Sequence, residues 1–220
     1  TPSNSSAASD VYKRQSMKTP LLSFLFFLVI FGACISDRKP ASAVDYSLLV
    51  NPFIGTDFTG NTYPGAQAPF GMVQLSPDNG LPGWDRISGY YYPDSTIAGF
   101  SHTHLSGTGA GDLYDISYMP VTLPYREAEA PLGIHSKFRH SDEEASAGYY
   151  RVLLKDYNIN VELTATERCG IQRYTFPKAQ SAVFLNLKKA MNWDFTQDSH
   201  IEVVDSCTCL LYTSPSPRDA

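Results

Sequence analysis

An indole and a carboxylate stand side by side in a glycine-containing segment of the chain. Trp84 and Asp85 follow Gly83 and precede three tyrosines at residues 90–92. A sugar needs both kinds of group, because a flat apolar ring covers its C–H face and a carboxylate accepts hydrogen bonds from two hydroxyls. The same pair is also typical of a core tryptophan beside an aspartate that caps a turn. The residues alone leave both interpretations open.

Two histidines, His102 and His104, are separated by a single residue. On a strand, residues i and i+2 face the same side, so the two imidazoles could share a metal ion, a substrate or a hydrogen-bond network. A zinc site would need a third ligand, and the spacing of Asp112 and Asp115 is generic. A structural network or the wall of a polar cleft is therefore favoured over a metal site.

Tight turns are predicted around Gly60 and Asn61, which lie between the motifs NPFIGT at residues 51–56 and TYPGAQAPFG at residues 62–71. Backbone amides at Gly60 and Asn61 could face a ligand. Catalytic side chains are not evident anywhere. The carboxylates are scattered without an acid–base pair, and neither a GxSxG elbow nor a catalytic Cys/His signature is present. The sequence therefore predicts an exported β domain with a carbohydrate-type cleft and no catalytic residue of its own.

The second half of the chain supplies the elements that position these side chains. Five short segments alternate polar and apolar residues, are rich in Val, Ile, Tyr, Phe and Thr, and are separated by short polar turns. They are residues 148–155, 160–166, 170–176, 182–187 and 200–204. Residues 51–111 show little alternation and are expected to form long loops or an elaborated site on a sheet. The expected fold is all-β, an antiparallel β-sandwich.

Composition agrees with a turn-rich β protein and excludes several classes. The 220 residues include 15 glycines, 15 prolines, 14 tyrosines and 12 phenylalanines. Collagen, coiled coil and bulk disorder are excluded. The formal charge of −5 argues against a nucleic-acid partner, since non-specific nucleic-acid binding requires a basic surface.

An export signal is predicted at residues 17–33. Lys18 follows Met17, and the apolar run that comes next is shorter than the roughly 20 residues of a spanning helix. The run ends in Phe-Gly-Ala before Cys34, which resembles a bacterial lipobox in which the cysteine is lipidated. Residues 34–44 would then be a tether, and the only contact with a membrane would be the lipid anchor. We expect a periplasmic or outer-membrane-anchored lipoprotein of a Gram-negative bacterium; the alternative is an ordinary signal peptide with an incidental cysteine.

Both ends of the chain look like translated sequencing adapter. The stretches SSAASDVYKRQ and CLLYTSPSPRDA can be back-translated so that they contain reverse complements of one shared element. Residues 1–16 and 207–220 are accordingly expected to be artefacts, with residues 1–16 disordered. The natural domain is expected to span residues 45–206 and to be truncated.

An ordered set of motifs resembles the N-terminal domain of glycoside hydrolase family 92. The motifs are NPFIGT, TYPGAQAPFGMVQLSPD, GWDRISGYYYPDSTIAGFSHTHLSGTG and VELTATERCGIQRYTFP, and the similarity runs from about Tyr46 to Asp205. The resemblance implies a calcium-dependent, exo-acting α-mannosidase that trims mannans and N-glycans. It also implies an N-terminal β-sandwich followed by an (α/α)6 helical barrel, which this chain lacks.

The same resemblance implies how the work is divided between the two domains. The general acid, the general base and the calcium ligands of the inverting reaction would come from the helical domain. The N-terminal domain would supply part of the wall around the terminal mannose. Six residues of this chain match that wall or its motifs: Trp84, Asp85, Gly60, Asn61, His102 and His104. The fragment itself is expected to be inactive; the alternative is a stand-alone carbohydrate-binding lipoprotein.

Overall fold

The computed structural model describes residues 44–107, 114–128, 133–187, 196 and 198–213, and these are the residues discussed below. The chain divides into two units, Thr1–Val44 and Asp45–Ala220, of which the second contains the fold. The predicted signal peptide, Cys34 and residues 1–16 lie outside the described residues. Within the described ranges, no helix has the length and apolar character needed to cross a membrane.

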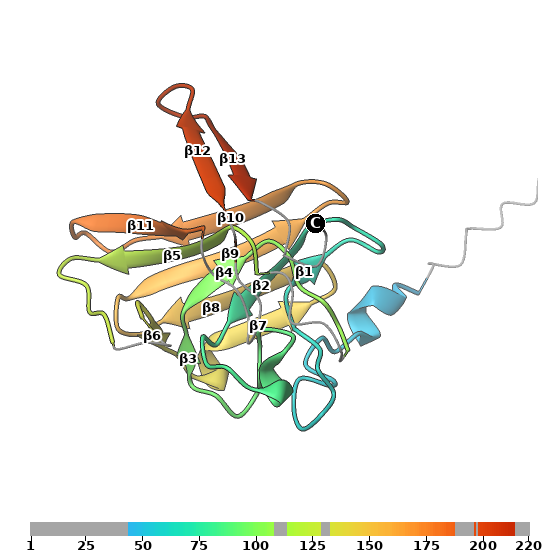
Figure 1. Ribbon diagram of the computed structural model, residues 1–220. Coiled ribbons are helices and arrows are strands. Elements are labelled where there is room, and N and C mark those ends of the chain that lie inside the picture. The colour runs from blue at the N-terminus through green and yellow to red at the C-terminus, as the bar shows by residue number, and fades with distance from the viewer. Residues whose placement is uncertain (1–43, 108–113, 129–132, 188–195, 197, 214–220) are drawn as a thin grey trace, which may run out of the picture. The chain divides into compact units, whose positions relative to one another are not determined.

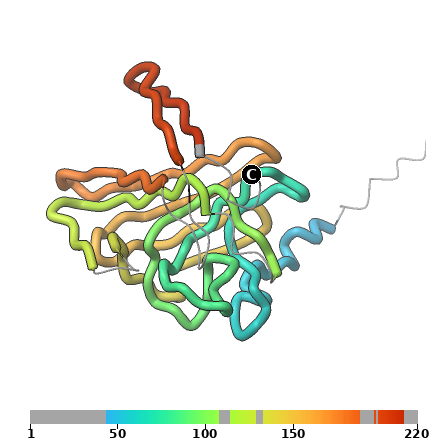
Figure 2. The backbone as a smooth tube through the Cα atoms, in the orientation of Figure 1, coloured from blue at the N-terminus to red at the C-terminus, as the bar shows by residue number. Residues whose placement is uncertain are grey.

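Two antiparallel sheets form the domain (Figure 1). The larger has the order β1-β2-β4-β5-β11, with the bounds Ala66–Gln67, Gln74–Asp78, Gly99–Ser101, Ser117–Thr122 and Ser181–Asn186. The smaller has the order β10-β9-β8-β7, with the bounds Gly170–Thr175, Ile159–Ala165, Tyr149–Leu154 and Glu143–Ser146. Figure 2 shows β5 and β11, which lie far apart in the sequence, running side by side as an antiparallel pair.

Shorter elements complete the described part of the chain. Two further pairs join β3 (Thr96–Ile97) to β6 (Ser136–Lys137) and β12 (Ser199–Val203) to β13 (Cys209–Thr213). Three 3-10 turns are η1 (Tyr46–Leu49), η2 (Trp84–Arg86) and η3 (His140–Asp142). Strand β13 falls within residues 207–220, and its residues 209–213 pair with β12; the assignment of residues 207–220 to an adapter stays a prediction.

The core lies between the two sheets, as alternation along the strands requires. In β9, Ile159, Val161 and Leu163 are buried, and the residues between them are only half-buried. Strand β9 contacts β1, β2 and β5 of the larger sheet, which contribute buried side chains such as Leu75 and Val121. Each such side chain contributes about 1.5–3 kcal/mol when it is taken fully out of water. Burial on one face of each sheet therefore fixes which way each strand faces.

The predicted antiparallel β-sandwich is confirmed, and the five alternating segments coincide with β8 to β12 to within a residue or two at each end. The first half contains strands that the sequence did not reveal. Strand β2 reads QLSPD, and four of its five residues are buried. This strand buries Ser76 and Asp78 as well as Leu75, so it shows no hydrophobic alternation. The Asp78 carboxylate has partners elsewhere in the fold, in Ser101 and His104.

Candidate functional site

Three segments that carry the predicted site residues are held together at one end of the larger sheet. They are the 51–62 loop, residues 84–92 and residues 102–107 (Figure 1). Three hydrogen bonds link these segments, and a backbone carbonyl of the 51–62 loop accepts each of them. The Thr62 carbonyl accepts from the Ser88 hydroxyl at 2.9 Å, and the Thr56 carbonyl accepts from the Tyr92 amide at 2.8 Å. The Asn61 carbonyl accepts from the Gly107 amide at 2.7 Å. The structure therefore brings the predicted residues into one loop cluster.

Trp84 and Asp85 lie on η2, at the surface of this cluster. Trp84 is 51% exposed and Asp85 is half-buried, so the interpretation of Trp84 as a core residue is wrong. The Arg86 side chain anchors the turn through two hydrogen bonds of 2.6 Å to the Asp94 carboxylate, and its guanidinium lies 4.6 Å from the centre of the Tyr91 ring. The Asp94 contact raises the pKa of Arg86. An ion-paired arginine thus holds an exposed indole and a neighbouring carboxylate in place.

Gly60 allows the backbone of the 51–62 loop to pass close to itself. A Cβ at this position would lie 2.2 Å from the Gly55 carbonyl oxygen, a distance that only glycine avoids. Its amide donates to the Asp57 carbonyl at 3.2 Å, so this amide is used inside the loop instead of facing a ligand. The glycine signal in the sequence therefore reports a close backbone approach.

Asn61 is buried behind the loop surface, with 2% of its area exposed and a left-handed φ of 48°. Its side-chain amide donates to the Thr59 carbonyl at 3.3 Å. Its Oδ1 atom accepts no hydrogen bond from any described residue. A buried acceptor without a donor costs about 1–3 kcal/mol, so Asn61 carries an unsatisfied group at the centre of the cluster.

His104 forms the centre of a buried polar network. Its Nδ1 lies 2.8 Å from the Gln74 carbonyl oxygen and its Nε2 lies 2.8 Å from Oδ1 of Asp78. The Ser101 hydroxyl donates to the same carboxylate oxygen at 3.1 Å. A carbonyl only accepts, so Nδ1 carries a proton. The network therefore joins His104, Asp78 and Ser101 by hydrogen bonds, and the side chains of His104 and Asp78 are at most 2% exposed.

His102 has different partners, so the two histidines do not act as a pair. Its Nδ1 donates to the Ile116 carbonyl at 2.9 Å, and its ring centre lies 5.5 Å from that of Tyr118. The i, i+2 argument fails because β4 ends at Ser101, before either histidine. Of the three possibilities, the structure provides a network for His104 alone. Among the described residues, no three His, Cys, Asp or Glu side chains come together to hold a metal ion.

Stability is expected to fall in mild acid because of His102. Burial lowers the pKa of its imidazole below the ordinary value of 6.5, and the charge of His104 acts in the same direction. The unfolded chain then binds a proton at a higher pH than the folded chain does. This contribution to stability is present above pH 6.5 and is lost as the pH falls toward the lower, folded pKa.

His102→Gln is expected to remove that loss while it keeps a donor for the Ile116 carbonyl. Urea unfolding between pH 7.5 and pH 5 measures the slope of the unfolding free energy against pH. His200→Gln, which changes an exposed histidine of β12, is the matched control. An unchanged slope in His102→Gln would contradict the prediction.

A second buried carboxylate, which the sequence did not reveal, ties this cluster to the smaller sheet. Glu143 of β7 accepts hydrogen bonds from the Tyr90 hydroxyl at 2.8 Å, the Tyr150 hydroxyl at 2.7 Å and Nδ1 of His140 at 2.5 Å. The His140 ring stacks on Tyr92 with the ring centres 4.0 Å apart. Residues 90–92 are therefore pinned to β7 and β8. No local spacing signals this, because Tyr90 and Glu143 are 53 residues apart.

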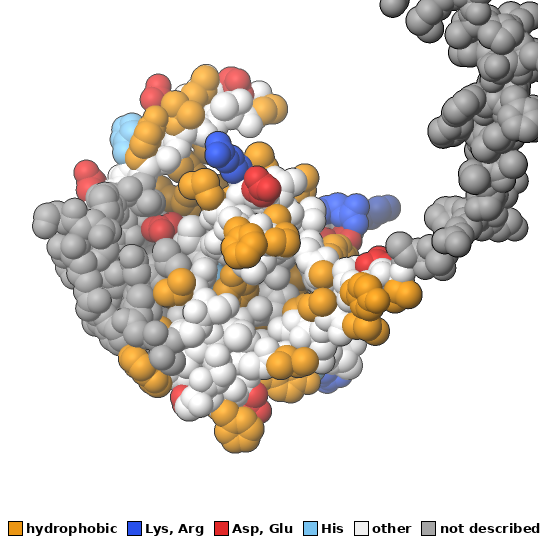
Figure 3. Space-filling model, turned by 90° about the vertical axis from the view of Figure 1, so that its right-hand side faces the viewer, with side chains coloured by type: hydrophobic (Ala, Val, Ile, Leu, Met, Phe, Trp, Pro, Cys, Tyr) orange, Lys and Arg blue, Asp and Glu red, His pale blue; other side chains and the backbone are white. Residues whose placement is uncertain are grey.

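Large apolar side chains are exposed on the same part of the chain. Leu48 and Leu49 of η1, Phe58 and Phe70 are between 76% and 105% exposed. In the view of Figure 3, hydrophobic side chains form several separate groups among uncharged polar atoms, with few charged side chains between them. Exposed apolar area of this extent is typical of a surface that packs against another protein part.

Comparison with known proteins identifies relatives among glycosidases. The α-mannosidase BT3965 of Bacteroides thetaiotaomicron, a family GH92 enzyme solved in complex with mannoimidazole, is 38% identical with a TM-score of 0.68; the match covers 72% of this chain and 22% of that one. The GH92 family glycosyl hydrolase ccman5 is 30% identical with a TM-score of 0.63, covering 77% of this chain and 24% of that one. An uncharacterized secreted glycosidase of Arthroderma benhamiae is 26% identical over 160 residues, 68% of this chain and 20% of that protein.

This chain therefore spans between 20% and 24% of the length of these three relatives. The profile of the glycosyl hydrolase family 92 N-terminal domain matches residues 49–217, which include both sheets and the loop cluster. The resemblance that the sequence motifs predicted is thereby confirmed. The chain belongs to glycoside hydrolase family 92 and carries that family's N-terminal domain.

Proposed function

We propose that this chain forms one wall of the sugar site of an enzyme that hydrolyses terminal α-mannosides of glycans. The observation that carries the proposal is the pairing of a half-exposed indole, Trp84, with the half-buried Asp85. In the described part of the chain, no donor hydrogen-bonds to the Asp85 carboxylate, so it is available to a ligand. Support also comes from the relatives, of which one is an α-mannosidase solved with mannoimidazole.

The roles follow from where each side chain lies. Trp84 covers the apolar C–H face of the mannose, and Asp85 accepts hydrogen bonds from two of its hydroxyls. Asn61, with 2% of its area exposed, lies beneath the loop and supports it from below. His104 is too deeply buried to touch a sugar and instead holds β2 against residues 101–104. His102, which is half-buried, lines the edge of the same cluster.

Hydrolysis with inversion needs two carboxylates on opposite sides of the scissile bond. Two buried carboxylates near the loop cluster, Asp78 and Glu143, are already engaged with His104 and with His140 and two tyrosines. We assign the acid, the base and calcium binding to the remainder of the enzyme. Among the described residues, no three His, Cys, Asp or Glu side chains come together to bind calcium. A relative of 29% identity is an inverting mannosidase.

The exposed apolar side chains of η1, Phe58 and Phe70 fit a further domain of the same enzyme. Exposed aliphatic and aromatic groups cost free energy in water, and covering them would recover about 25 cal/mol for each Å². The chain represents about a fifth of the enzymes that it resembles, so most of each relative lies outside the matched region. A helical domain that carries the catalytic carboxylates is the proposed occupant. Export through residues 17–33 and lipidation at Cys34 complete the proposal, with the enzyme acting outside the cytoplasm.

Sugar binding and hydrolysis, measured separately on the full chain, test the proposal. Calorimetric titration with methyl α-mannoside is expected to show weak binding that Trp84→Ala lowers about fivefold, because stacking on an aromatic ring contributes about 1 kcal/mol. Tyr212→Ala removes an aromatic ring that is 59% exposed on the β13 strand and is the matched control. An aryl α-mannoside with calcium is expected to show no turnover by this chain.

Three results would contradict the proposal. Equal sugar affinity in Trp84→Ala and in the parent chain would remove Trp84 from the site. Turnover of the aryl mannoside above the buffer rate would show that the chain carries its own catalytic groups. Sequencing of the source DNA beyond the codon for Ser206 gives the third: a stop codon there would favour a stand-alone carbohydrate-binding lipoprotein.

A further inference from the structure

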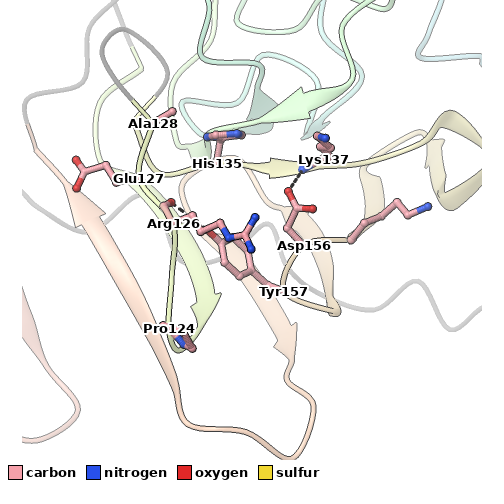
Figure 4. Close-up of a pocket in the computed structure, with 9 residues that line it drawn as sticks. Pro124, Arg126, Glu127, Ala128, His135, Lys137, Asp156 and Tyr157 are labelled. Carbon is pink, nitrogen blue, oxygen red and sulfur yellow. Dashed lines mark hydrogen bonds between the residues drawn. The ribbon is translucent and has the colours of Figure 1, made fainter.

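A cavity of about 770 Å³ lies away from the loop cluster, between the end of β5 and the turn that joins β8 to β9 (Figure 4). It shares no lining residue with the segments around Asn61, Trp84 or His104. Its size falls within the range of about 300–1,000 Å³ that is usual for small-molecule sites. Its lining residues are Pro124, Arg126, Glu127, Ala128, His135, Lys137, Lys155, Asp156 and Tyr157.

Three cations from three different segments line this cavity. Arg126 follows β5, Lys137 belongs to β6 and Lys155 follows β8. Within the described ranges, none of the three lies within 4.0 Å of a carboxylate, whereas Arg86, Arg151 and Arg173 elsewhere in the domain are all ion-paired. The cavity therefore gathers three cations that form no ion pair with the described residues.

The backbone forces two of these cations together. The Lys155 amide donates to the Lys137 carbonyl at 2.9 Å, so the two lysines occupy neighbouring positions on paired segments. Like charges in such positions repel each other. A second hydrogen bond, from the amide of Asp156 to the Ser136 hydroxyl at 3.1 Å, holds the same turn in place. Lys137 and Lys155 are therefore held on neighbouring backbone positions at the wall of the cavity.

Two carboxylates, Glu127 and Asp156, also line the cavity, so the three cations exceed the anions of the lining by one charge. One oxygen of Asp156 accepts the Lys137 amide at 2.9 Å, so that oxygen is engaged by the backbone. The Glu127 side chain points away from the other labelled side chains in Figure 4. The Tyr157 hydroxyl donates to the Arg126 carbonyl at 3.4 Å, which places the Arg126 backbone beside this hydroxyl. The half-buried His135, whose Nδ1 donates to the Gly133 carbonyl at 2.9 Å, adds a further polar group to the wall.

We propose that this cavity binds a phosphate group through Arg126, Lys137 and Lys155, either as free phosphate or as part of a phosphorylated saccharide. A phosphate has enough acceptor oxygens to contact an arginine fork and two ammonium groups at once. The cavity volume leaves room for a sugar ring attached to the phosphate. This inference does not depend on the mannose site, which uses other residues.

Calorimetric titration of the full chain at low ionic strength tests the site with three probes: inorganic phosphate, glucose 6-phosphate and glucose. Both phosphate-bearing probes are expected to bind, and glucose is not. Lys155→Gln and Arg126→Gln are each expected to weaken phosphate binding about tenfold or more, the usual effect of losing a charged hydrogen bond. Added salt is expected to weaken binding further, because it screens exposed charges.

Arg151→Gln is the matched control, since it removes one positive charge from the exposed face of β8, where Arg151 pairs with Glu144. It is expected to keep the affinity of the parent chain. Tighter binding of glucose 6-phosphate than of phosphate supports a phosphorylated saccharide as the source, and equal binding supports free phosphate. No binding of either probe, or the same loss in Arg151→Gln as in Lys155→Gln, overturns the proposal. Because Trp84→Ala leaves the cavity intact, a failure of the mannose site would leave phosphate binding unchanged.

Discussion

Asp78→Ala is expected to lower the free energy of unfolding by about 1–3 kcal/mol for each buried group that loses its partner; these groups are Nε2 of His104 and the Ser101 hydroxyl. The carboxylate lies 2.8 Å from Nε2 of His104, and both side chains are at most 2% exposed. His104 keeps a proton on Nδ1 because the Gln74 carbonyl accepts from it. Without Asp78, the imidazole loses its partner in a site that excludes water. Urea unfolding followed by intrinsic fluorescence measures the change.

A double-mutant cycle separates the interaction energy of His104 with Asp78 from the loss of stability that either substitution causes by disturbing the core. His104→Leu alone and Asp78→Ala alone each leave the other member of the pair without its hydrogen-bond partner. In the double variant, neither member of the pair remains. The double variant is therefore expected to be more stable, by 1 kcal/mol or more, than the sum of the single effects predicts. Additive losses, or a loss below about 1 kcal/mol in Asp78→Ala, would show that the pair does not stabilise the fold.

Glu143→Ala is expected to cost about 3 kcal/mol and to loosen residues 90–92. Its carboxylate, 1% exposed, is the shared acceptor for two tyrosine hydroxyls and for Nδ1 of His140. Burial and the charge of Glu143 both raise the pKa of Tyr150, so that tyrosine remains a donor at neutral pH. Removing the acceptor leaves buried hydroxyls without a partner, at about 1–3 kcal/mol for each.

The neighbouring Glu144 supplies the control for this prediction. Its side chain is 58% exposed and pairs with Arg151 on the outer face of the sheet. Glu144→Ala is therefore expected to change stability by less than about 1 kcal/mol. Hydrogen exchange of the amides at residues 90–92 is expected to speed up in Glu143→Ala and not in Glu144→Ala. Equal effects of the two substitutions would mean that Glu143 contributes no more than a surface carboxylate does.

Much of the fold could be predicted because strands in the second half of the chain alternate apolar and polar residues, a pattern that is visible within each strand. Along β9, apolar residues alternate with polar ones, and the buried residues are those that the alternation selects. Strand β2 could not be predicted in this way, because its buried residues include Ser76 and Asp78. The Asp78 carboxylate is stabilised inside the protein by Ser101 and His104, which come from another strand and the segment after it.

The candidate site was predicted in part for a similar reason. The types of Trp84 and Asp85 were informative by themselves, because an indole beside a carboxylate suits a sugar wherever the pair is exposed. Gly60 was informative for another reason, since its close approach to Gly55 is a requirement of the loop and not of a ligand. The spacing of His102 and His104 suggested a shared role, but the strand on which that argument depended ends before them.

The sequence by itself determined the β-class, the places of the strands in the second half and the family. These depend on local alternation and on the order of motifs along the chain, and neither requires knowledge of contacts between distant residues. Only the tertiary structure decided that His104 pairs with Asp78, 26 residues away, and that Arg126, Lys137 and Lys155 surround one cavity. Sheet pairing and burial set these contacts between distant residues. Side chains with no pattern along the chain thus become partners in the folded domain.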